Sequence, residues 1–392
     1  MGWGPPYGPW RYRVLAEPQV TLELARLSNA QSSQGRVDTL TFQPCPNPEE
    51  QSQDRYIVQD WDLRGGTWRF AGVFDGHAGQ EAVDYTVANL PNLIKQSLET
   101  AVTSSHEIGS STISQLLADS IQQLDDSLTH GLLDLFPGGP DAISRLTDAD
   151  IQSIVNDGGE NSRKVVRCMR GTTALVSLID PRQENLWVAS LGDCQAVLGV
   201  KNSNQDWDVS ILSSNHNGRE PSEVERIHKA HPGEPECVLR DRVLGAIAVT
   251  RAIGDHLFKL PSIYTERVFM NAKPGFRIST AIQEFLPRNI SPPYLTANAD
   301  VQHVNLVSIE GTERFLIMCS DGLVDLYDAP NLDVELAERW IRIVSDANGE
   351  NRALSLLRDS LGGTDEKKVS RMMTVEMDSR WMDDVTLVVQ RV

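Results

Sequence analysis

The chain has 392 residues, of which 40% are hydrophobic, and a formal net charge of −18. This length and apolar content are enough for one large domain or two ordinary domains, each with a hydrophobic core. The acidic balance argues against nucleic acid or an anionic membrane surface as the main partner, because both bind through basic patches.

The first 50 residues predict an arm and a loop. Residues 1–16 contain Arg11 and Arg13 and no acid, as transit peptides do, but their prolines and glycines would break an amphipathic helix. We therefore expect an arm that anchors on the domain through its aromatic side chains, which are Trp3, Tyr7, Trp10 and Tyr12. A short amphipathic helix over 20–27 and a polar, proline-bearing loop over 29–53 should follow.

Strand pairing is expected to begin after this loop. Residues 55–61 and 67–74 flank a turn with two glycines, as the strands of a hairpin do. The second strand leads into Asp75-Gly76-His77-Ala78-Gly79, so a carboxylate and an imidazole follow directly on a strand end. A rigid strand end can hold a ligand still. The alternative is an ordinary Asp-Gly turn with a surface histidine.

The rest of the chain predicts helices on strand-rich sheets. Two helices, 80–101 and 113–133, should cover one sheet face, and 136–160 should be an exposed insertion with one short helix. Antiparallel strands are expected over 172–179, 185–190, 195–200 and 209–212, with 195–198 as the hairpin return of the strand before it. The remaining elements are helices over 221–230, 332–346 and 352–361, a long irregular segment over 262–295, and a last strand over 385–389.

Three more aspartates lie at strand ends: Asp193 and Asp321 follow apolar strands, and Asp383 precedes the last one. If these carboxylates converge with Asp75, each pair about 4 Å apart repels by roughly 4 kcal/mol at an effective dielectric constant near 20. Such a cluster needs cations. Hard oxygen ligands, with a backbone carbonyl from Gly76, favour Mg²⁺ or Mn²⁺ over Zn²⁺. The alternative is a set of unrelated turns.

The five cysteines are odd in number and scattered, and none forms a Cys-x-x-Cys pair, which fits a reducing compartment. No stretch approaches the apolar length of a membrane span, and no charged-then-apolar secretory leader opens the chain. We therefore expect a soluble, intracellular protein without membrane insertion.

Six segments, taken in this order, resemble the metal-dependent serine/threonine protein phosphatases of type 2C. They are VFDGHAG at 73–79, GTTA at 171–174, LGDC at 191–194, VTRAIGD at 249–255, CSDGLVD at 319–325 and DDVT at 383–386. The stretch 291–296, with the long insert before it, looks most like the pyruvate dehydrogenase phosphatase branch. The resemblance covers most of the chain and implies one catalytic domain over 51–392, with inserts at about 134–165 and 262–295, after the arm and loop of 1–50.

The resemblance implies an α+β fold, a four-layer α-β-β-α sandwich in which two antiparallel sheets are flanked by helix pairs. It implies hydrolysis of phosphoserine and phosphothreonine in proteins by a metal-activated water, with two Mg²⁺ or Mn²⁺ ions and a weaker third ion. The partner would be a phosphorylated protein and not nucleic acid. The enzyme would be a monomer of the mitochondrial matrix or the cytoplasm.

The resemblance also implies a set of metal ligands. Asp75 and the carbonyl of Gly76 would hold one ion, while Asp75, Asp321 and Asp383 would hold the other, largely through water. Asp193 and Asp325 match the positions that bind the third ion. For these last two, a capping or solvated aspartate is the alternative.

His77 is the expected general acid, because it lies two residues from the bridging Asp75 and so beside the leaving group. The alternative is a structural histidine in an exposed turn. Asp255 follows a tight glycine turn and is expected to be structural. Asp384 matches an asparagine of the family and is not an expected ligand.

The chain departs from the family pattern before its first long strand. Gln53-Asp54 stands where relatives carry a Glu-Asp pair, so Asp54 is expected outside the direct ligands, and the loss of a charge would weaken the second ion. Glu49 occupies the place of the arginine that grips the substrate phosphate. Arg36 and Arg55 are replacements to test, with a solvated arginine as the alternative for each, and the phosphate-binding residue is unknown.

These departures motivate a second hypothesis, in which the chain is a catalytically impaired phosphatase fold that acts as a regulatory binding module. A nucleotide-binding enzyme is a weak third hypothesis, because the chain has no Gly-x-x-x-x-Gly-Lys-Ser/Thr loop.

The insert over 262–295 is too long for a simple connection and is expected to be a substrate-facing flap. Its basic and aromatic residues would suit an acidic phosphoprotein. They are Arg267, Lys273, Arg277 and Arg288, with Tyr264, Phe269, Phe276 and Phe285. The alternative is a packed surface insert with no partner.

Overall fold

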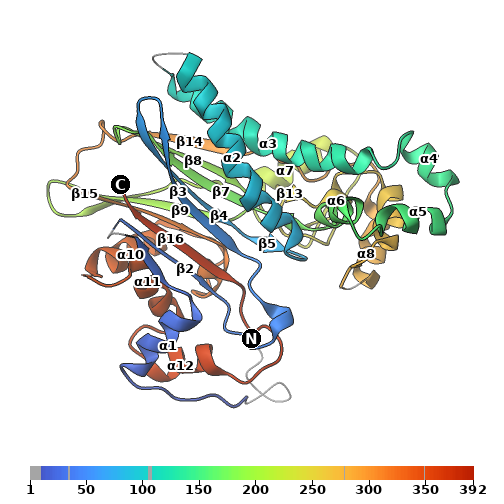
Figure 1. Ribbon diagram of the computed structural model, residues 1–392. Helices are drawn as coiled ribbons and strands as arrows, with labels where there is room; N and C mark the ends of the chain where they lie inside the picture. The colour runs from blue at the N-terminus through green and yellow to red at the C-terminus, as the bar shows by residue number, and fades with distance from the viewer. Residues whose placement is uncertain (1–9, 34–35, 105–107, 278, 348) are drawn as a thin grey trace.

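A computed structural model describes residues 10–33, 36–104, 108–277, 279–347 and 349–392 (Figure 1). Its α-helices are α1 (Gln19–Leu27), α2 (Glu81–Ser104), α3 (Ser110–Leu133), α4 (Gly139–Arg145), α5 (Asp148–Val155), α6 (Glu160–Met169), α7 (Pro221–Ala230), α8 (Ser279–Phe285), α9 (Gly322–Asp325), α10 (Val334–Asp346), α11 (Arg352–Leu361) and α12 (Glu366–Thr374). Its strands are β1 (Gln31–Ser33), β2 (Val37–Phe42), β3 (Arg55–Leu63), β4 (Gly66–Phe74), β5 (Gly76–His77), β6 (Gly171–Thr172), β7 (Ala174–Ile179), β8 (Asn185–Leu191), β9 (Gln195–Lys201), β10 (Trp207–Ile211), β11 (Val238–Leu239), β12 (Arg242–Val243), β13 (Ile253–Gly254), β14 (Asp300–Asn305), β15 (Glu313–Cys319) and β16 (Val385–Arg391).

Two large antiparallel sheets form the centre of the molecule. One has the order β14-β8-β7-β4-β3 and the other the order β1-β2-β16-β15-β9-β10. The predicted hairpin is confirmed, since β3 and β4 pair antiparallel with Trp61 opposite Trp68. A small sheet, β13-β6-β5, extends from the end of β4.

The two sheets pack face to face through an apolar layer. Strand β7 is buried at every position, as expected of a strand that is covered on both faces. The side chains that meet between the sheets include Val73, Leu175 and Val188 from one sheet and Leu198, Leu316 and Val388 from the other.

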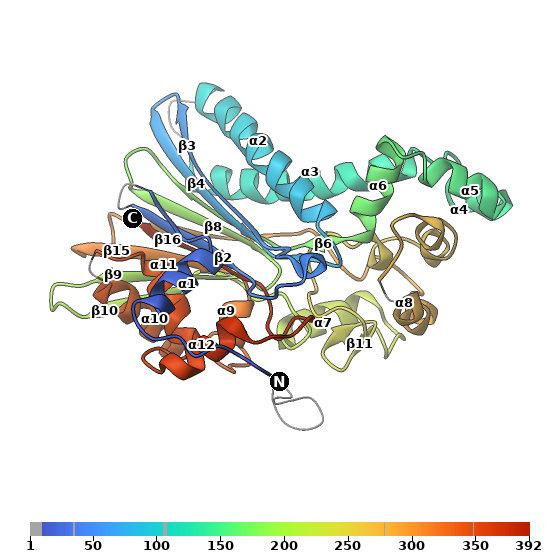
Figure 2. The same cartoon turned by 60° about the horizontal axis from the view of Figure 1, so that its bottom comes forward.

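Helices cover the outer face of each sheet, α2 and α3 on one side and α10 and α11 with α1 and α12 on the other (Figures 1 and 2). Leu90 and Leu117 of the first pair share a core with Phe70 of β4. Trp340 of α10 and Leu357 of α11 share another with neighbouring strands. The predicted α+β fold, with antiparallel sheets between helices, is confirmed.

The connection between β8 and β9 differs from the sequence prediction. Residues 195–198 were expected to return as a hairpin beside β8, but β8 pairs with β7 and β14, whereas β9 pairs with β10 and β15. The hairpin prediction is wrong because the turn at Gly192 carries the chain from one sheet to the other. Asp193 therefore lies at the seam between the sheets.

The region before residue 51 also differs from the prediction. The helix over 20–27 is confirmed as α1, but the loop predicted over 29–53 contains β2, which pairs with β16 inside the six-stranded sheet. The arm lies along α12 through backbone contacts, because the amides of Arg13 and Leu15 donate to Thr374 Oγ1 and Ser370 Oγ. Its aromatic anchoring is not observed, since Trp10 and Tyr12 are exposed, and Trp3 and Tyr7 lie outside the described residues.

The two inserts are more regular than predicted. Two helices, α4 and α5, occupy the segment for which one short helix was expected, and α6 follows directly. The segment over 262–295 holds a π-helical turn at Tyr264–Val268 and the short α8. Figures 1 and 2 show both inserts on the same side of the molecule.

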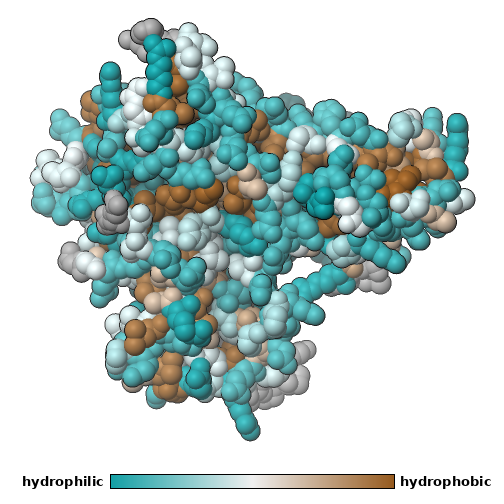
Figure 3. All heavy atoms as spheres, in the orientation of Figure 1, coloured by the Kyte–Doolittle hydropathy of each residue, from teal (hydrophilic) through white to brown (hydrophobic). Residues whose placement is uncertain are grey.

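The face drawn in Figure 3 is mostly hydrophilic, with apolar side chains in separate clusters, as the strong net charge would suggest. None of the described helices combines the length and the apolar character needed to cross a membrane.

Candidate metal centre

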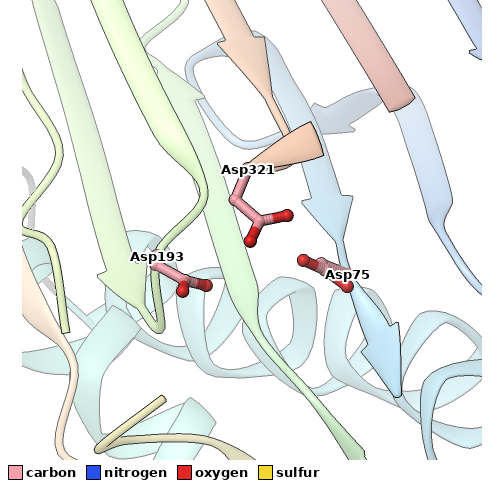
Figure 4. A group of neighbouring side chains, drawn as sticks. All are labelled: Asp75, Asp193 and Asp321. Atoms are coloured by element: carbon pink, nitrogen blue, oxygen red, sulfur yellow. The ribbon is translucent and has the colours of Figure 1, made fainter. Parts of the chain in front are cut away.

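Three aspartates from both large sheets converge at one end of the sandwich. Asp75 follows β4, Asp193 lies in the β8–β9 connection and Asp321 follows β15, and their carboxylates point toward one another (Figure 4). One carboxylate oxygen from each lies within 4.8 Å of the others. Asp321, Asp325 and Asp383 form a second group, whose carboxylate oxygens also lie within 4.8 Å of one another. The structure thus brings together the aspartates that the sequence nominated for the metal site.

The backbone fixes Asp75 before any cation binds. Its amide donates to Thr173 Oγ1 at 3.0 Å, and its carbonyl accepts from the amide of Thr173 at 2.9 Å. At the next residue, a Cβ on Gly76 would stand 2.6 Å from the carbonyl oxygen of Gln53, so only glycine lets the two segments approach this closely. A rigid strand end of this kind positions a ligand precisely enough for a cation.

Crowding and burial oppose negative charge in the cluster. Burial and then the Asp321 carboxylate raise the pKa of Asp75 well above its ordinary value, and burial and then Asp193 do so for Asp321. Burial raises the pKa of Asp193 to about 6. Burial and then Asp384 raise the pKa of Asp54 to about 8. The site therefore favours bound positive charge.

The donor set fits a hard divalent cation. Both groups contain only carboxylates, the ligands that Mg²⁺, Mn²⁺ and Ca²⁺ prefer. Asp193 Oδ1 is buried and accepts no hydrogen bond from the described residues, so the protein leaves it available for another partner. Cys194 lies next to it, but its Sγ is within 3.1 Å of the Thr173 hydroxyl, and burial raises the pKa of its thiol.

The grouping of the acids differs in detail from the arrangement implied by the resemblance. Asp321, and not Asp75, belongs to both groups of carboxylates. Asp193 and Asp325, which were expected around a third ion, lie inside the two groups.

The carboxylate of Asp384 accepts hydrogen bonds from other groups of the protein. Its carboxylate accepts from Gln43 Nε2 at 2.9 Å, from the amide of Gln53 at 2.8 Å and from Arg380 Nη1 at 3.0 Å. The amide of Asp384 in turn donates to Asp383 Oδ1 at 2.8 Å. Asp384 thus holds the segment before β16 in place, which agrees with its exclusion from the expected ligands.

His77 faces a residue that the sequence reading treated as structural. His77 Nε2 lies 2.6 Å from Asp255 Oδ2, and Asp255 is almost completely buried. Burial opposes the imidazolium, but the Asp255 carboxylate, together with Asp193 and Asp383, outweighs this, and the pKa of His77 is raised. Asp255 is therefore the orienting partner of His77.

The small sheet explains how His77 and Asp255 meet. Strand β6 pairs with β5 on one side and β13 on the other, with Gly171 opposite His77 and Gly254. A Cβ on Gly171 would lie 2.2 Å from His77 Nε2 and 2.0 Å from Asp255 Oδ2. Only glycine at this position leaves room for the pair.

A buried ion pair ties α3 to the segment that carries Asp255. Asp125 accepts from the amide of Gly254 at 2.8 Å and from Lys259 Nζ at 2.7 Å, and Lys259 Nζ also donates to the carbonyl of Ala252 at 2.8 Å. The side chains of Asp125 and Lys259 are only 5% and 8% exposed. Nothing local in the sequence marks this long-range pair.

We expect Asp125→Ala to lower the free energy of unfolding by about 3–5 kcal/mol, because it leaves the buried Lys259 ammonium without its counter-ion and the buried amide of Gly254 without its acceptor. Urea unfolding of the metal-free protein measures this. Asp126→Ala changes an exposed neighbour on the same helix and should stay within about 0.5 kcal/mol. Equal effects of the two substitutions would contradict the assignment.

The structure shows the surroundings of the residues that depart from the family pattern and of the arginines considered as replacements. Gln53 Oε1 accepts from the amide of Gly79 at 2.8 Å and so braces the loop after Asp75. Asp54 is buried, and neither of its carboxylate oxygens accepts a hydrogen bond of normal geometry from the described residues. Arg55 pairs with Asp84 of α2 at 2.8 Å, and Arg36 lies at the end of β2 away from the acids. Neither arginine lines the site.

Two cavities open onto the acids. One of about 620 Å³ is lined by Asp75, His77, Asp321 and Asp383 together with apolar residues of the 262–295 insert. A smaller one of about 300 Å³ is polar and shares Asp193, Asp321 and Asp383. Arg242 lines both.

The basic aromatic surface predicted on the insert is not free. Arg267 pairs with Asp148 at 3.1 Å, Arg288 pairs with Glu236 at 2.8 Å, and Arg277 pairs with Glu50. Most of the aromatic side chains are buried, namely Tyr264, Phe269 and Phe285. The predicted basic patch is therefore reduced to Lys273, which is exposed and has no ion pair among the described residues, because acids of the protein neutralise the three arginines. The insert does border the site.

Comparisons with known proteins identify the family of the chain. A family model described as Protein phosphatase 2C matches residues 47–356. A protein phosphatase 2C homolog of Schizosaccharomyces pombe is 26% identical over 369 residues, covering 86% of this chain and 76% of that protein. The mitochondrial [pyruvate dehydrogenase [acetyl-transferring]]-phosphatase 1 of Homo sapiens is 29% identical over 389 residues, covering 81% and 71%.

Two solved structures share the fold at 17% sequence identity. The serine-threonine phosphatase 2C from Toxoplasma gondii superposes with a TM-score of 0.50 and covers 92% of this chain and 96% of that one. A sex determining protein of C. elegans gives a TM-score of 0.53, and the match spans 92% of this chain and 66% of that one.

Proposed function

The chain belongs to the protein phosphatase 2C family, and from this premise we propose that it hydrolyses phosphoserine and phosphothreonine in proteins with the help of Mg²⁺ or Mn²⁺. The observation that carries the proposal is the convergence of Asp75, Asp193 and Asp321 from three strand ends, with Asp383 and Asp325 beside them.

We assign the cation ligands to the chain's carboxylates. Asp75, Asp321 and Asp383, with the carbonyl of Gly76, would hold two ions, and Asp193 and Asp325, which each belong to one of the two groups around Asp321, would add ligands there or support a third ion. When bound, such ions supply a Lewis acid that acidifies a water and offsets the charge of the phosphoryl oxygens.

The side chains around the acids would handle the proton and the substrate. His77, held by Asp255 with a raised pKa, carries the proton that the leaving serine or threonine oxygen needs. Gln53 braces the loop that carries His77 through the amide of Gly79. The 620 Å³ cavity beside the acids gives a phosphorylated segment room to approach.

The alternative, an impaired fold that serves as a regulatory binding module, rests on Gln53 and on the missing arginine at position 49. Retention of every acidic ligand candidate weighs against it, because buried and crowded carboxylates cost folding free energy unless they hold a cation.

A phosphatase assay separates the two hypotheses. Phosphothreonine and phosphoserine peptides should lose phosphate with Mn²⁺ or Mg²⁺, and excess chelator should reduce the rate to background. A phosphotyrosine peptide serves as the control for residue class. Hydrolysis that persists in chelator would exclude the metal role, and no hydrolysis with either ion would favour the binding module.

We also propose an intracellular location, in the mitochondrial matrix or the cytoplasm. All five cysteines are free, as expected in a reducing compartment, and several relatives are named as mitochondrial. Because those relatives are named pyruvate dehydrogenase phosphatases, phosphorylated pyruvate dehydrogenase is the first protein substrate to assay.

A further inference from the structure

The larger cavity at the acids has two chemically different halves. One half holds the carboxylates and His77, which suit a phosphate and its cations. The other half is apolar and is built from the end of α6 and from two consecutive parts of the chain, the stretch from β12 through η2 (His256–Phe258) and the 262–295 insert. Phosphate chemistry does not need an apolar wall, so this half suits another part of the substrate.

The apolar wall is firmly built but not closed. Phe258 and Phe285 stack with ring centroids 4.9 Å apart and are almost completely buried, which fixes the insert against the domain. In front of them, Ile247, Phe276 and Ile282 line the cavity and are only half-buried. Their free apolar surface is therefore available to a ligand.

Positively charged side chains also line this cavity. Arg288 and Arg380 line it, but they are held by Glu236 and by Asp384 respectively. Arg242 is exposed, donates to the carbonyl of Ala246 at 3.1 Å and has no ion pair among the described residues. Arg242 lines both cavities, so its guanidinium can meet an anionic group of a substrate.

We propose that this cavity binds a phosphorylated segment that carries a bulky apolar side chain close to the phosphoresidue. The phosphate lies toward the acids and Arg242, and the apolar side chain fills the space before Ile247, Phe276 and Ile282. The inference rests on the proposed function and deepens it, because it names the class of protein substrate. Continuity of the wall with the reaction centre sets the spacing, since one cavity contains both.

Two series of phosphothreonine peptides test the proposal. Their members differ at one residue, leucine in one series and alanine in the other, at each of the three positions on either side of the phosphothreonine. At one position or more, kcat/KM of the leucine peptide should exceed that of its alanine partner by about tenfold, the gain expected from burying most of one leucine side chain.

Variants of the wall should remove this preference. Ile282→Glu places a charge on the wall, and Ala281→Trp fills the cavity from an exposed position without removing core packing. In both, kcat/KM for the leucine peptide should fall and the leucine-to-alanine ratio should approach one. Ile290→Glu is the matched control, because Ile290 belongs to the same insert, is 69% exposed and lies outside the cavity.

The outcomes separate this inference from the proposed function. Equal kcat/KM for leucine and alanine peptides at every position, or a preference that survives both wall variants, overturns the inference while the phosphatase assignment stands. Fluorescence anisotropy of the same peptides gives a Kd without turnover. If neither peptide is hydrolysed, the proposed function fails, and equal Kd values would then reject the apolar site as well.

Discussion

Replacing Asp321 with asparagine is expected to lower kcat by at least about 100-fold at saturating Mn²⁺. Asp321 belongs to both groups of carboxylates, so its loss weakens both candidate cation sites. Loss of even an outer partner of a metal ligand commonly costs 10–100-fold in metal affinity or activity, and loss of a ligand should cost no less. Phosphothreonine peptide hydrolysis over a range of Mn²⁺ concentrations measures the effect.

The same substitution should not destabilise the metal-free protein. The folded-state pKa of Asp321 lies above its ordinary value of 3.8, so the unfolded chain releases this proton first. The Asp321 carboxyl group therefore lowers the free energy of unfolding once the pH rises above 3.8, and substitution by asparagine removes this destabilisation. The metal-free variant should be at least as stable as the wild type at pH 7.5, while the Mn²⁺-induced rise in Tm should be lost.

Asp328→Asn is the matched control, because Asp328 is exposed, lies a few residues further along and belongs to neither group. It should keep both the turnover and the Mn²⁺-induced rise in Tm. Near wild-type turnover of Asp321→Asn at saturating Mn²⁺ would remove Asp321 from the proposed centre.

His77→Ala should lower kcat on a phosphoserine peptide by about 10²–10⁴-fold, the usual contribution of a general acid. The loss should be much smaller on an activated aryl phosphate, whose leaving group needs no proton. Asp255→Asn should show the same substrate dependence to a smaller degree, because asparagine no longer orients and charges the imidazole as the carboxylate does. Comparing kcat on the two substrates measures this.

His130→Ala is the control, because His130 is exposed on α3. It tests whether the loss of any histidine lowers kcat more on the peptide than on the aryl phosphate. It should leave both rates unchanged. If His77→Ala reduces kcat equally on the peptide and on the aryl phosphate, His77 does not supply the proton.

The acids at strand ends could be predicted because the signal is local. Asp75 directly follows an apolar run and Asp321 follows one after a single serine, so both aspartates lie where that pattern ends. Their convergence could only be inferred, since it depends on how the two sheets pack. The turn at Asp193 shows the difficulty, because a short turn has the same composition whether its strands pair or cross between sheets.

Strand β2 and the partner of His77 were missed for related reasons. Strand β2 carries Asp38, which weakens an apolar pattern, but its carboxylate accepts from Ser32 Oγ at 2.6 Å and from the amide of Arg352 at 3.0 Å. Asp255 lies 178 residues from His77 in the sequence. Its backbone has a left-handed φ of 51°, a conformation that is common in ordinary turns. Gly171 was the one sequence feature linked to this pair, but only the folded structure shows that it makes room for His77 and Asp255.

Equilibrium binding of Mn²⁺ to the metal-free protein tests the central claim most directly. Isothermal titration calorimetry, with free Mn²⁺ followed by electron paramagnetic resonance, gives the number of ions per chain without any dependence on substrate. Wild-type protein should bind at least two ions, and Asp321→Asn should bind fewer or bind them far more weakly. No saturable binding to the wild type, or the same number and affinity in the variant, would contradict a metal centre at these carboxylates.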